Sequence, residues 1–200
     1  MRTILSPPES TIIASDISPA LAALREATRE LHETLDAASP LTAPGFTSVD
    51  YLAYAARVSG WMRPVERHLY GTTLPWPSEL EVDARGQKSQ WLAQDLGDAT
   101  TVPQCPYAPM PDSLAQAYGL AYVCEGATLG GAYLYKRLLP QLAPLQLHWL
   151  KGYGADTGAR WKTFTTSLAH EVTTPAQIEA AAAMAREGFM TFERWMREGQ

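Results

Sequence analysis

The sequence is poor in the features that mark several large classes of protein. It contains two cysteines, Cys105 and Cys124, too few for a disulfide framework or for the usual four-ligand zinc pattern. It has no run of eighteen apolar residues, so we expect no helix to cross a membrane. It has no dense cluster of lysine and arginine, and its formal net charge is −5, which argues against a nucleic-acid partner. We therefore expect a soluble, cytoplasmic protein.

The first residues lack the unbroken apolar core of a secretion signal. Residues 1–17 place one arginine, and then proline, glutamate and serine, where that core would stand. We expect this stretch to be a flexible tail. Residues 18–198 are enough for one domain with a buried core and few for two. The content of 46% hydrophobic and 18% charged residues is typical of a globular protein.

Strand-like alternation is almost missing as well, and helical spacing dominates. Leucines between Ser18 and Ala38 recur at three-, four- and seven-residue steps, and Pro40 ends the pattern. We expect further helices over these stretches: from the N-cap Ser48 through Pro64, which would kink or divide the helix, to Gly71; around Ser89–Leu96; from Pro111 and Asp112 to about Leu139; around Ala159–His170; and from Thr174 to Glu198. The rest of residues 72–112 is proline-rich and predicted to be loop. The predicted fold class is all-α.

One histidine lies on a charged stripe of the first predicted helix. At about 100° per residue, Arg25 and Arg29 lie in line with His32. Asp36 lies one turn after the histidine. A neutral imidazole is a good ligand for haem iron, a carboxylate can orient its second ring nitrogen, and arginines bind carboxylates. A solvated helix face has the same pattern, so the stripe alone leaves both interpretations open.

Three glycines lie inside the helix that we expect to end near Leu139. Each of Gly126, Gly130 and Gly131 costs roughly 1 kcal/mol relative to alanine in a helix interior. Four-residue spacing puts Gly126 and Gly130 on one face, where another group can approach the backbone closely. Two explanations stay open: a second helix packs tightly on this face, or a flat ligand lies on it. A phosphate-binding loop is a poor alternative, because the glycines do not follow a strand.

Together these two segments resemble the haem oxygenase family, in particular its bacterial, biliverdin-producing branch. LREATRELHETLD resembles the family's proximal helix, and YVCEGATLGGAYL resembles its distal helix. The later stretches WLKGYGADTGARWKTF and TPAQIEAAAAMAREGFMTFERW are similar to its C-terminal half. The resemblance covers most of residues 18–198. It implies a single-domain helical fold with haem between the first helix and a kinked, glycine-containing helix.

On the proximal side, the resemblance makes His32 the axial ligand of the haem iron and Asp36 the carboxylate beside that ligand. Arg25 and Arg29 match basic positions that face the haem propionates. Phe189, in the last predicted helix, matches an aromatic residue that packs against the porphyrin.

On the distal side, Gly126, Gly130 and Gly131 match the glycines that let the kinked helix lie on the haem, where oxygen reacts. Tyr122, one turn before Gly126, is a candidate hydrogen-bond donor to a propionate.

Two positions depart from the animal members of the family. These have an aspartate after the first distal glycine, where it organises water beside bound oxygen, and this sequence has Ala127. Water and backbone groups would then carry the distal hydrogen bonds, because the alanine side chain has no polar atom. A propionate-binding arginine of the animal members has no clear counterpart; Lys162 is the nearest candidate and Arg160 a weaker one.

The implied activity is the oxidative cleavage of haem to biliverdin, carbon monoxide and ferrous iron, with haem as substrate and cofactor. It needs O2 and electrons from a ferredoxin- or reductase-type protein. A basic rim at the haem edge would suit an acidic donor; the candidates are Arg25, Arg29, Lys136, Arg137 and Lys162. A solvated helix C-terminus explains Lys136 and Arg137 equally well. The alternatives are a non-catalytic haem-binding carrier or sensor on the same fold, a helical enzyme acting on another small aromatic ligand, and a helical scaffold for protein partners.

Overall fold

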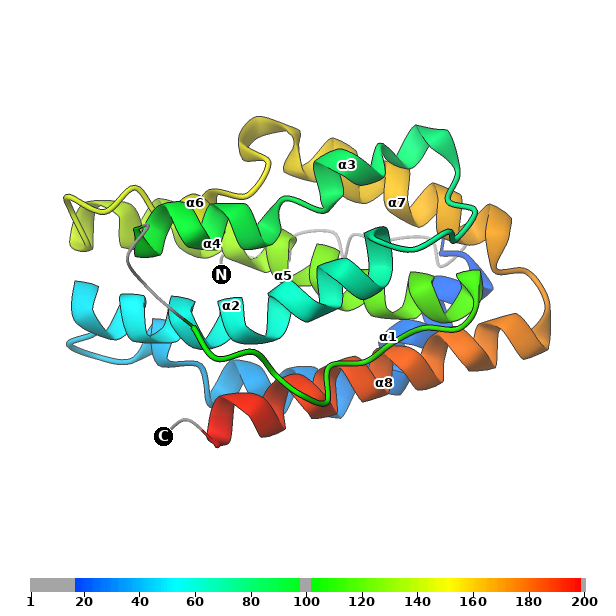
Figure 1. The fold of residues 1–200 in the computed structure, drawn as a ribbon, viewed down its shortest axis with the longest axis horizontal. Coiled ribbons are helices and arrows are strands. Elements are labelled where there is room, and N and C mark those ends of the chain that lie inside the picture. The colour runs from blue at the N-terminus through cyan, green and yellow to red at the C-terminus, as the bar shows by residue number, and fades with distance from the viewer. Residues whose placement is uncertain (1–16, 98–101, 199–200) are drawn as a thin grey trace, which may run out of the picture.

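The computed structural model describes residues 17–97 and 102–198, and within them every regular element is a helix (Figure 1). The α-helices are α1 (Pro19–Ala37), α2 (Ser48–Tyr70), α3 (Val82–Arg85), α4 (Lys88–Leu96), α5 (Leu114–Gln141), α6 (His148–Lys151), α7 (Thr157–Glu171) and α8 (Pro175–Arg197). Three short 3-10 helices are η1 (Pro40–Thr42), η2 (Ser78–Leu80) and η3 (Gly154–Asp156). The predicted all-α fold is confirmed. The predicted tail lies, apart from Ile17, outside the described residues.

Side-chain caps set the points where the helices begin. Ser18 caps α1, since its hydroxyl accepts from the backbone N–H of Leu21. The N-cap of α2 is Thr47 and not Ser48, because the Thr47 hydroxyl accepts from the backbone N–H of Asp50 while the Asp50 carboxylate accepts from the Thr47 N–H. The long helix α5 begins after its N-cap Ser113, slightly later than the sequence predicted.

Two prolines lie inside helices. Of the two effects expected of Pro64, a kink or a division of the helix, the division is wrong, because α2 continues through Pro64 to Tyr70. Pro64 has no N–H for the carbonyl of Gly60, four residues earlier, and this carbonyl instead accepts from the backbone N–H of Cys105 at 2.9 Å. The proline-rich loop thus supplies the hydrogen bond that the helix lacks. Pro140 lies in the last turn of α5 and does not end it.

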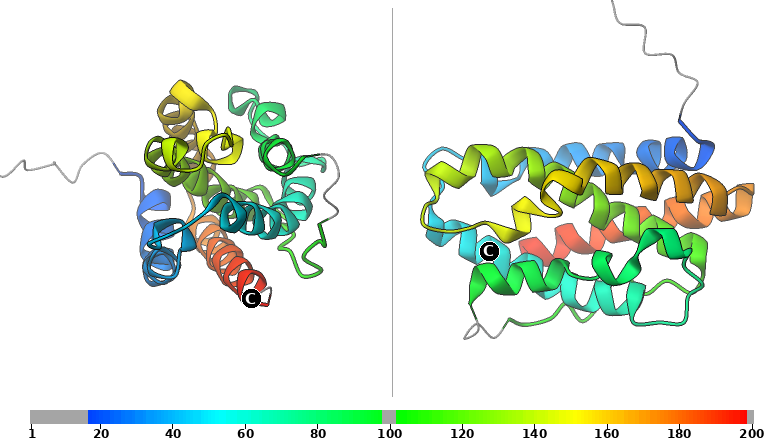
Figure 2. Two further views of the ribbon diagram at one scale, coloured as in Figure 1. Left: turned by 90° about the vertical axis from the view of Figure 1, so that its left-hand side faces the viewer. Right: turned by 90° about the horizontal axis from the view of Figure 1, so that it is seen from above.

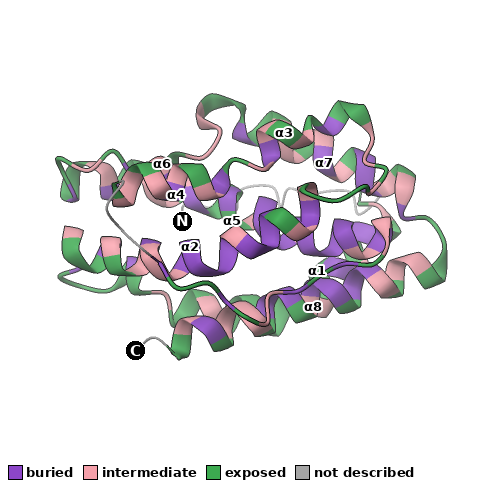
Figure 3. Ribbon diagram, in the orientation of Figure 1, coloured by how far each residue is buried: buried purple, intermediate pink, exposed green. Residues whose placement is uncertain are grey.

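The helix α5 runs through the middle of the protein. It packs against α8 on one side and against α6 and α7 on another, while α8 also packs against α1. Figure 1 and the left view of Figure 2 place α1 and α8 at the lower side of the molecule and α6 and α7 at the upper side. Most residues of α5 between 115 and 125 are buried (Figure 3).

A glycine allows the close approach of α5 and α8. A Cβ atom added at Gly119 would lie 2.0 Å from the carbonyl oxygen of Ala181, so the two backbones touch at this point. On the α8 side, a Cβ added at Gly188 would lie 3.1 Å from a methyl of Val123. Tight helix packing at glycine therefore occurs in this protein, at one end of α5.

Among the helices of the described residues, none combines the length and the apolar character that a bilayer crossing requires.

Candidate functional site

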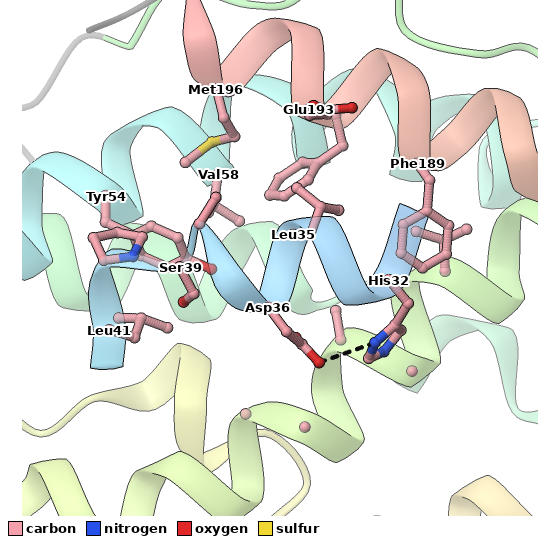
Figure 4. A pocket seen from close by; sticks show the side chains of 18 of the residues that line it. His32, Leu35, Asp36, Ser39, Leu41, Tyr54, Val58, Phe189, Glu193 and Met196 are labelled. Carbon is pink, nitrogen blue, oxygen red and sulfur yellow. Dashed lines mark ion pairs between the residues drawn. The ribbon is translucent and has the colours of Figure 1, made fainter. Parts of the chain in front are cut away.

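A cavity of about 650 Å³ lies between α1, η1, α2, α5 and the C-terminal half of α8 (Figure 4). This volume falls within the roughly 300–1,000 Å³ that is usual for ligand and cofactor sites. The walls are mainly apolar and aromatic, and include Leu35, Tyr54, Trp61, Phe189, Phe192 and Met196. Such a lining suits a large apolar ligand with few polar groups.

His32 lines the cavity from α1, and two neighbours hold its ring. The Nδ1 atom lies 3.0 Å from the Asp36 carboxylate, one turn later on the same helix (dashed line in Figure 4). The ring packs against that of Phe189 of α8 at a centroid distance of 5.8 Å. Because Nδ1–H donates to the carboxylate, the lone pair of a neutral ring is on Nε2. The side chain is 56% exposed, so a ligand can reach it.

The helix α5 forms another wall of the cavity, and the middle of this wall has almost no side chain. This wall contains Gly126, Ala127, Gly130 and Gly131. A Cβ added at Gly126 or Gly130 would have no heavy atom of the described residues within 4 Å beyond its own helix. At Gly131 it would make an ordinary contact, at 3.5 Å, with Leu150. Helix packing therefore does not explain Gly126 and Gly130, whose backbone a flat ligand can approach.

A cysteine also lines the cavity, one turn before Thr128 on α5. Burial raises the pKa of the Cys124 thiol to about 12. The group is therefore a neutral thiol near pH 7, whereas a cysteine that binds iron does so as thiolate. His32 is the better candidate for a metal ligand in this cavity.

Six of the predicted site residues line this one cavity: His32, Asp36, Gly126, Gly130, Gly131 and Phe189. They come from α1, α5 and α8, so the fold brings together segments that are far apart in the sequence. The roles that the resemblance implies for them stay predictions.

The two predicted arginines of α1 do not line the cavity. Arg25 and Arg29 are exposed. Arg25 lies two turns before His32, about 10 Å along the helix axis. The guanidinium of Arg29 is within 4.0 Å of three carboxylates on its own helix, those of Glu26, Glu30 and Glu33. A ligand would have to extend beyond the cavity to meet either arginine.

Tyr122 and Lys162 also lie outside the cavity lining. Tyr122 is half-buried, with its ring 5.9 Å from that of Trp161. Lys162 is exposed on α7 and borders a separate depression of about 350 Å³ together with Glu79 and His170. A propionate would therefore have to extend beyond the cavity to contact Tyr122 or Lys162, as predicted.

Sequence reasoning missed the arginine that does line the cavity. Arg197, near the end of α8, is the one lysine or arginine among the described lining residues, and its guanidinium lies 3.5 Å from Glu193. Four- and eight-residue spacing from Phe189 puts Glu193 and Arg197 on the same face of α8, so a helical projection could have found them. The rim thus offers one guanidinium to a ligand that carries carboxylates.

The residues present fit haem as the ligand. An imidazole with its second nitrogen held by a carboxylate is a usual iron ligand. The missing side chains at Gly126 and Gly130 leave space for a flat ring, and the apolar walls match a porphyrin.

The family model described as "Heme oxygenase" matches residues 18–198 of this chain. No curated protein sequence matches this chain. Among solved structures, the chain is similar to the heme oxygenase from Neisseria meningitidis in its NO- and CO-bound forms, with 21% identity and a TM-score of 0.68. The similarity covers 91% of this chain and 92% of the Neisseria chain, which confirms the single-domain helical fold. The family match extends over nearly the whole chain, and the chain therefore belongs to the haem oxygenase family.

Proposed function

We propose that this protein cleaves haem to biliverdin, carbon monoxide and ferrous iron, and that His32 would hold the haem iron. One observation carries the proposal: a single cavity is lined by the His32 imidazole, which the Asp36 carboxylate holds, and by two glycines at which an added Cβ would meet no neighbouring atom. When bound, haem supplies the iron that binds O2 and the ring that is opened.

The chain's own groups have four tasks in this proposal. Asp36 accepts the Nδ1 hydrogen of His32, which leaves the Nε2 lone pair available to the iron that haem would supply. A neutral imidazole donates less electron density to iron than a thiolate would. Gly126 and Gly130 would leave room for O2 beside the bound ring, and their backbone together with water would supply the hydrogen bonds that the Ala127 side chain cannot form. The apolar walls exclude bulk water.

Electrons have to come from a partner protein, for which we propose an acidic ferredoxin- or reductase-type donor. Lys136 is exposed near the C-terminal end of α5, on the same helix as the cavity glycines. The neighbouring Arg137 donates to the backbone carbonyl of Leu41, a residue of the cavity wall, at 2.8 Å. Lys136 therefore tests docking of the donor, while a change at Arg137 would also disturb the wall.

Hemin titration followed by a single turnover tests the proposed function. We expect a one-to-one complex with a Soret band, which is replaced by biliverdin absorbance when a reductase and oxygen are added. His68→Ala is a suitable control for His32→Ala, because His68 lies outside the cavity, with its Nδ1 2.8 Å from the carbonyl oxygen of Pro109. A stable Soret band without biliverdin would identify a non-catalytic haem carrier or sensor. No stoichiometric hemin binding would refute both functions.

A further inference from the structure

Three charged side chains are buried together between α5 and the segment before it. Arg85 of α3, Lys88 of α4 and Glu125 of α5 are each at most 2% exposed. None of them lines the cavity. Buried charges are costly unless they are paired and fully hydrogen-bonded, so such a cluster calls for a reason.

The carboxylate of Glu125 is the centre of this cluster. It accepts from Arg85 Nη1 at 2.7 Å and from Lys88 Nζ at 2.8 Å. The hydroxyl of Tyr153 donates to it at 3.0 Å and accepts from Lys88 Nζ at 2.9 Å. A single side chain of α5 is therefore tied to α3, to α4 and to the residue that precedes η3.

Every strong donor in the cluster has a partner. Lys88 Nζ also donates to the Arg85 carbonyl at 2.8 Å. Arg85 donates to the carbonyl of Leu80 at 2.6 Å and to that of Arg160 at 3.0 Å, which adds η2 and α7 to the elements held. Burial lowers the pKa of Lys88, but the Glu125 carboxylate, together with Tyr153 and Cys124, more than offsets this, and the pKa stays above its ordinary value. Lys88 is therefore charged at neutral pH.

A second buried carboxylate balances the charge. Glu66 of α2 accepts from the backbone N–H groups of Lys88 and Ser89 at 2.6 and 3.0 Å, at the N-terminus of α4. Among the hydrogen bonds of the described residues, none joins Glu66 to α5, so Glu66 holds α4 to α2 and not to the glycine-containing helix. Two cations and two carboxylates thus form a neutral set.

Glu125 lies roughly opposite the cavity on α5. At about 100° per residue, Gly126, Gly130 and Leu134 share the cavity side of the helix, and Glu125 faces away from it. At Gly126 and Gly130 the cavity side of α5 carries no side chain, and Ala127 between them carries only a methyl group, so these positions offer little that could fix the rotation of the helix. The charged cluster on the opposite side of α5 supplies such a constraint at Glu125, next to Gly126.

We propose that Glu125, held by Arg85, Lys88 and Tyr153, is a positioning residue. It fixes the rotation of α5 about its axis and the position of α5 along that axis, so that the backbone at Gly126 and Gly130 forms a distal wall at a defined depth in the cavity. This inference rests on the proposed function, because the depth of the wall matters for haem and O2. Replacing buried ion pairs by apolar groups often leaves stability unchanged, so the role of the cluster is geometric.

The C–O stretching band of the ferrous carbonyl complex tests this role, because it reports on the distal surroundings and needs no turnover. The main variant is Glu125→Gln with Lys88→Met, which leaves the charges of Arg85 and Glu66 balanced. We expect hemin to bind with a Soret band like that of the wild type, a C–O band that shifts and broadens or splits, and a wider mixture of biliverdin isomers. Should this variant not fold, Tyr153→Phe leaves all charges in place and gives the same readouts with a smaller shift.

Glu66→Gln is the matched control, since it removes a buried carboxylate from the same region without a bond to α5. A sharp, unshifted C–O band and an unchanged isomer pattern in the folded cluster variants would overturn the inference. The same broadening in Glu66→Gln would also overturn it, because general loosening would then explain the effect. If the wild type binds no hemin, the proposed function has failed and not the positioning role alone.

Discussion

Alanine at Gly126 should stabilise the protein without ligand and weaken its complex with haem. The added Cβ meets no heavy atom of the described residues within 4 Å beyond its own helix, so the protein gains helix propensity at no steric cost. The gain is roughly 0.5–1 kcal/mol. For a chain of this size, 1 kcal/mol corresponds to about 2–4 °C in Tm.

The same methyl group occupies the space that we assign to the porphyrin. Overpacking of a fitted site typically costs about 1–3 kcal/mol. Since 1.4 kcal/mol is a factor of ten, the Kd for hemin should rise about 5- to 150-fold. Gly130→Ala should act in the same direction, because its Cβ position is equally open.

Differential scanning fluorimetry without hemin and a hemin titration measure the two effects. Gly119→Ala is the control, because its Cβ would lie 2.0 Å from the Ala181 carbonyl oxygen and should lower Tm by forcing α5 and α8 apart. A lower Tm for Gly126→Ala, or an unchanged Kd for hemin, would refute the assignment of these glycines to a ligand surface.

Three further predictions follow from single contacts. Asp36→Asn should leave hemin bound but weaken the iron–imidazole bond, because Nδ1 of His32 loses its carboxylate; an unchanged iron–imidazole stretching frequency would contradict this. Lys136→Glu should slow electron delivery from an acidic donor at low salt and not at high salt, and equal rates in stopped-flow reduction would remove Lys136 from the docking surface. Cys124, studied with Cys105 replaced by serine, should resist a thiol reagent at pH 8 until the protein unfolds. Rapid labelling of the folded protein would contradict the burial of this thiol. The pKa of about 12 in the folded protein exceeds the ordinary value of 9, so the stability contributed by the protonated thiol is complete below pH 9 and is lost as the pH rises towards 12.

Helical spacing and the recognisable segments around His32 and Gly126 were enough to predict the six longer helices and residues of two cavity walls, but not the short helices α3 and α6. Periodicity carries this information because each apolar stripe is local to its helix. The meaning of the glycines was not readable from spacing alone: Gly119 contacts a neighbouring backbone, and Gly126 faces open space, although both lie in the same helix.

The buried cluster could not be predicted for a different reason. Arg85 and Lys88 lie in the proline-rich segment, before the helix predicted around Ser89–Leu96, and they meet Glu125 about 40 residues later in the chain. A charged residue in a sequence is expected at the surface, and only tertiary structure shows that these are buried and paired. The arginine at the cavity rim was missed because Arg197 looks like an ordinary C-terminal helix cation.

The axial bond of the ferrous haem complex tests the central claim most directly. Resonance Raman spectroscopy should show an iron–imidazole stretching band in the wild type that is absent in His32→Ala and returns when free imidazole is added. A band that persists in His32→Ala without added imidazole would mean that another residue binds the iron, and the site described here would be wrong.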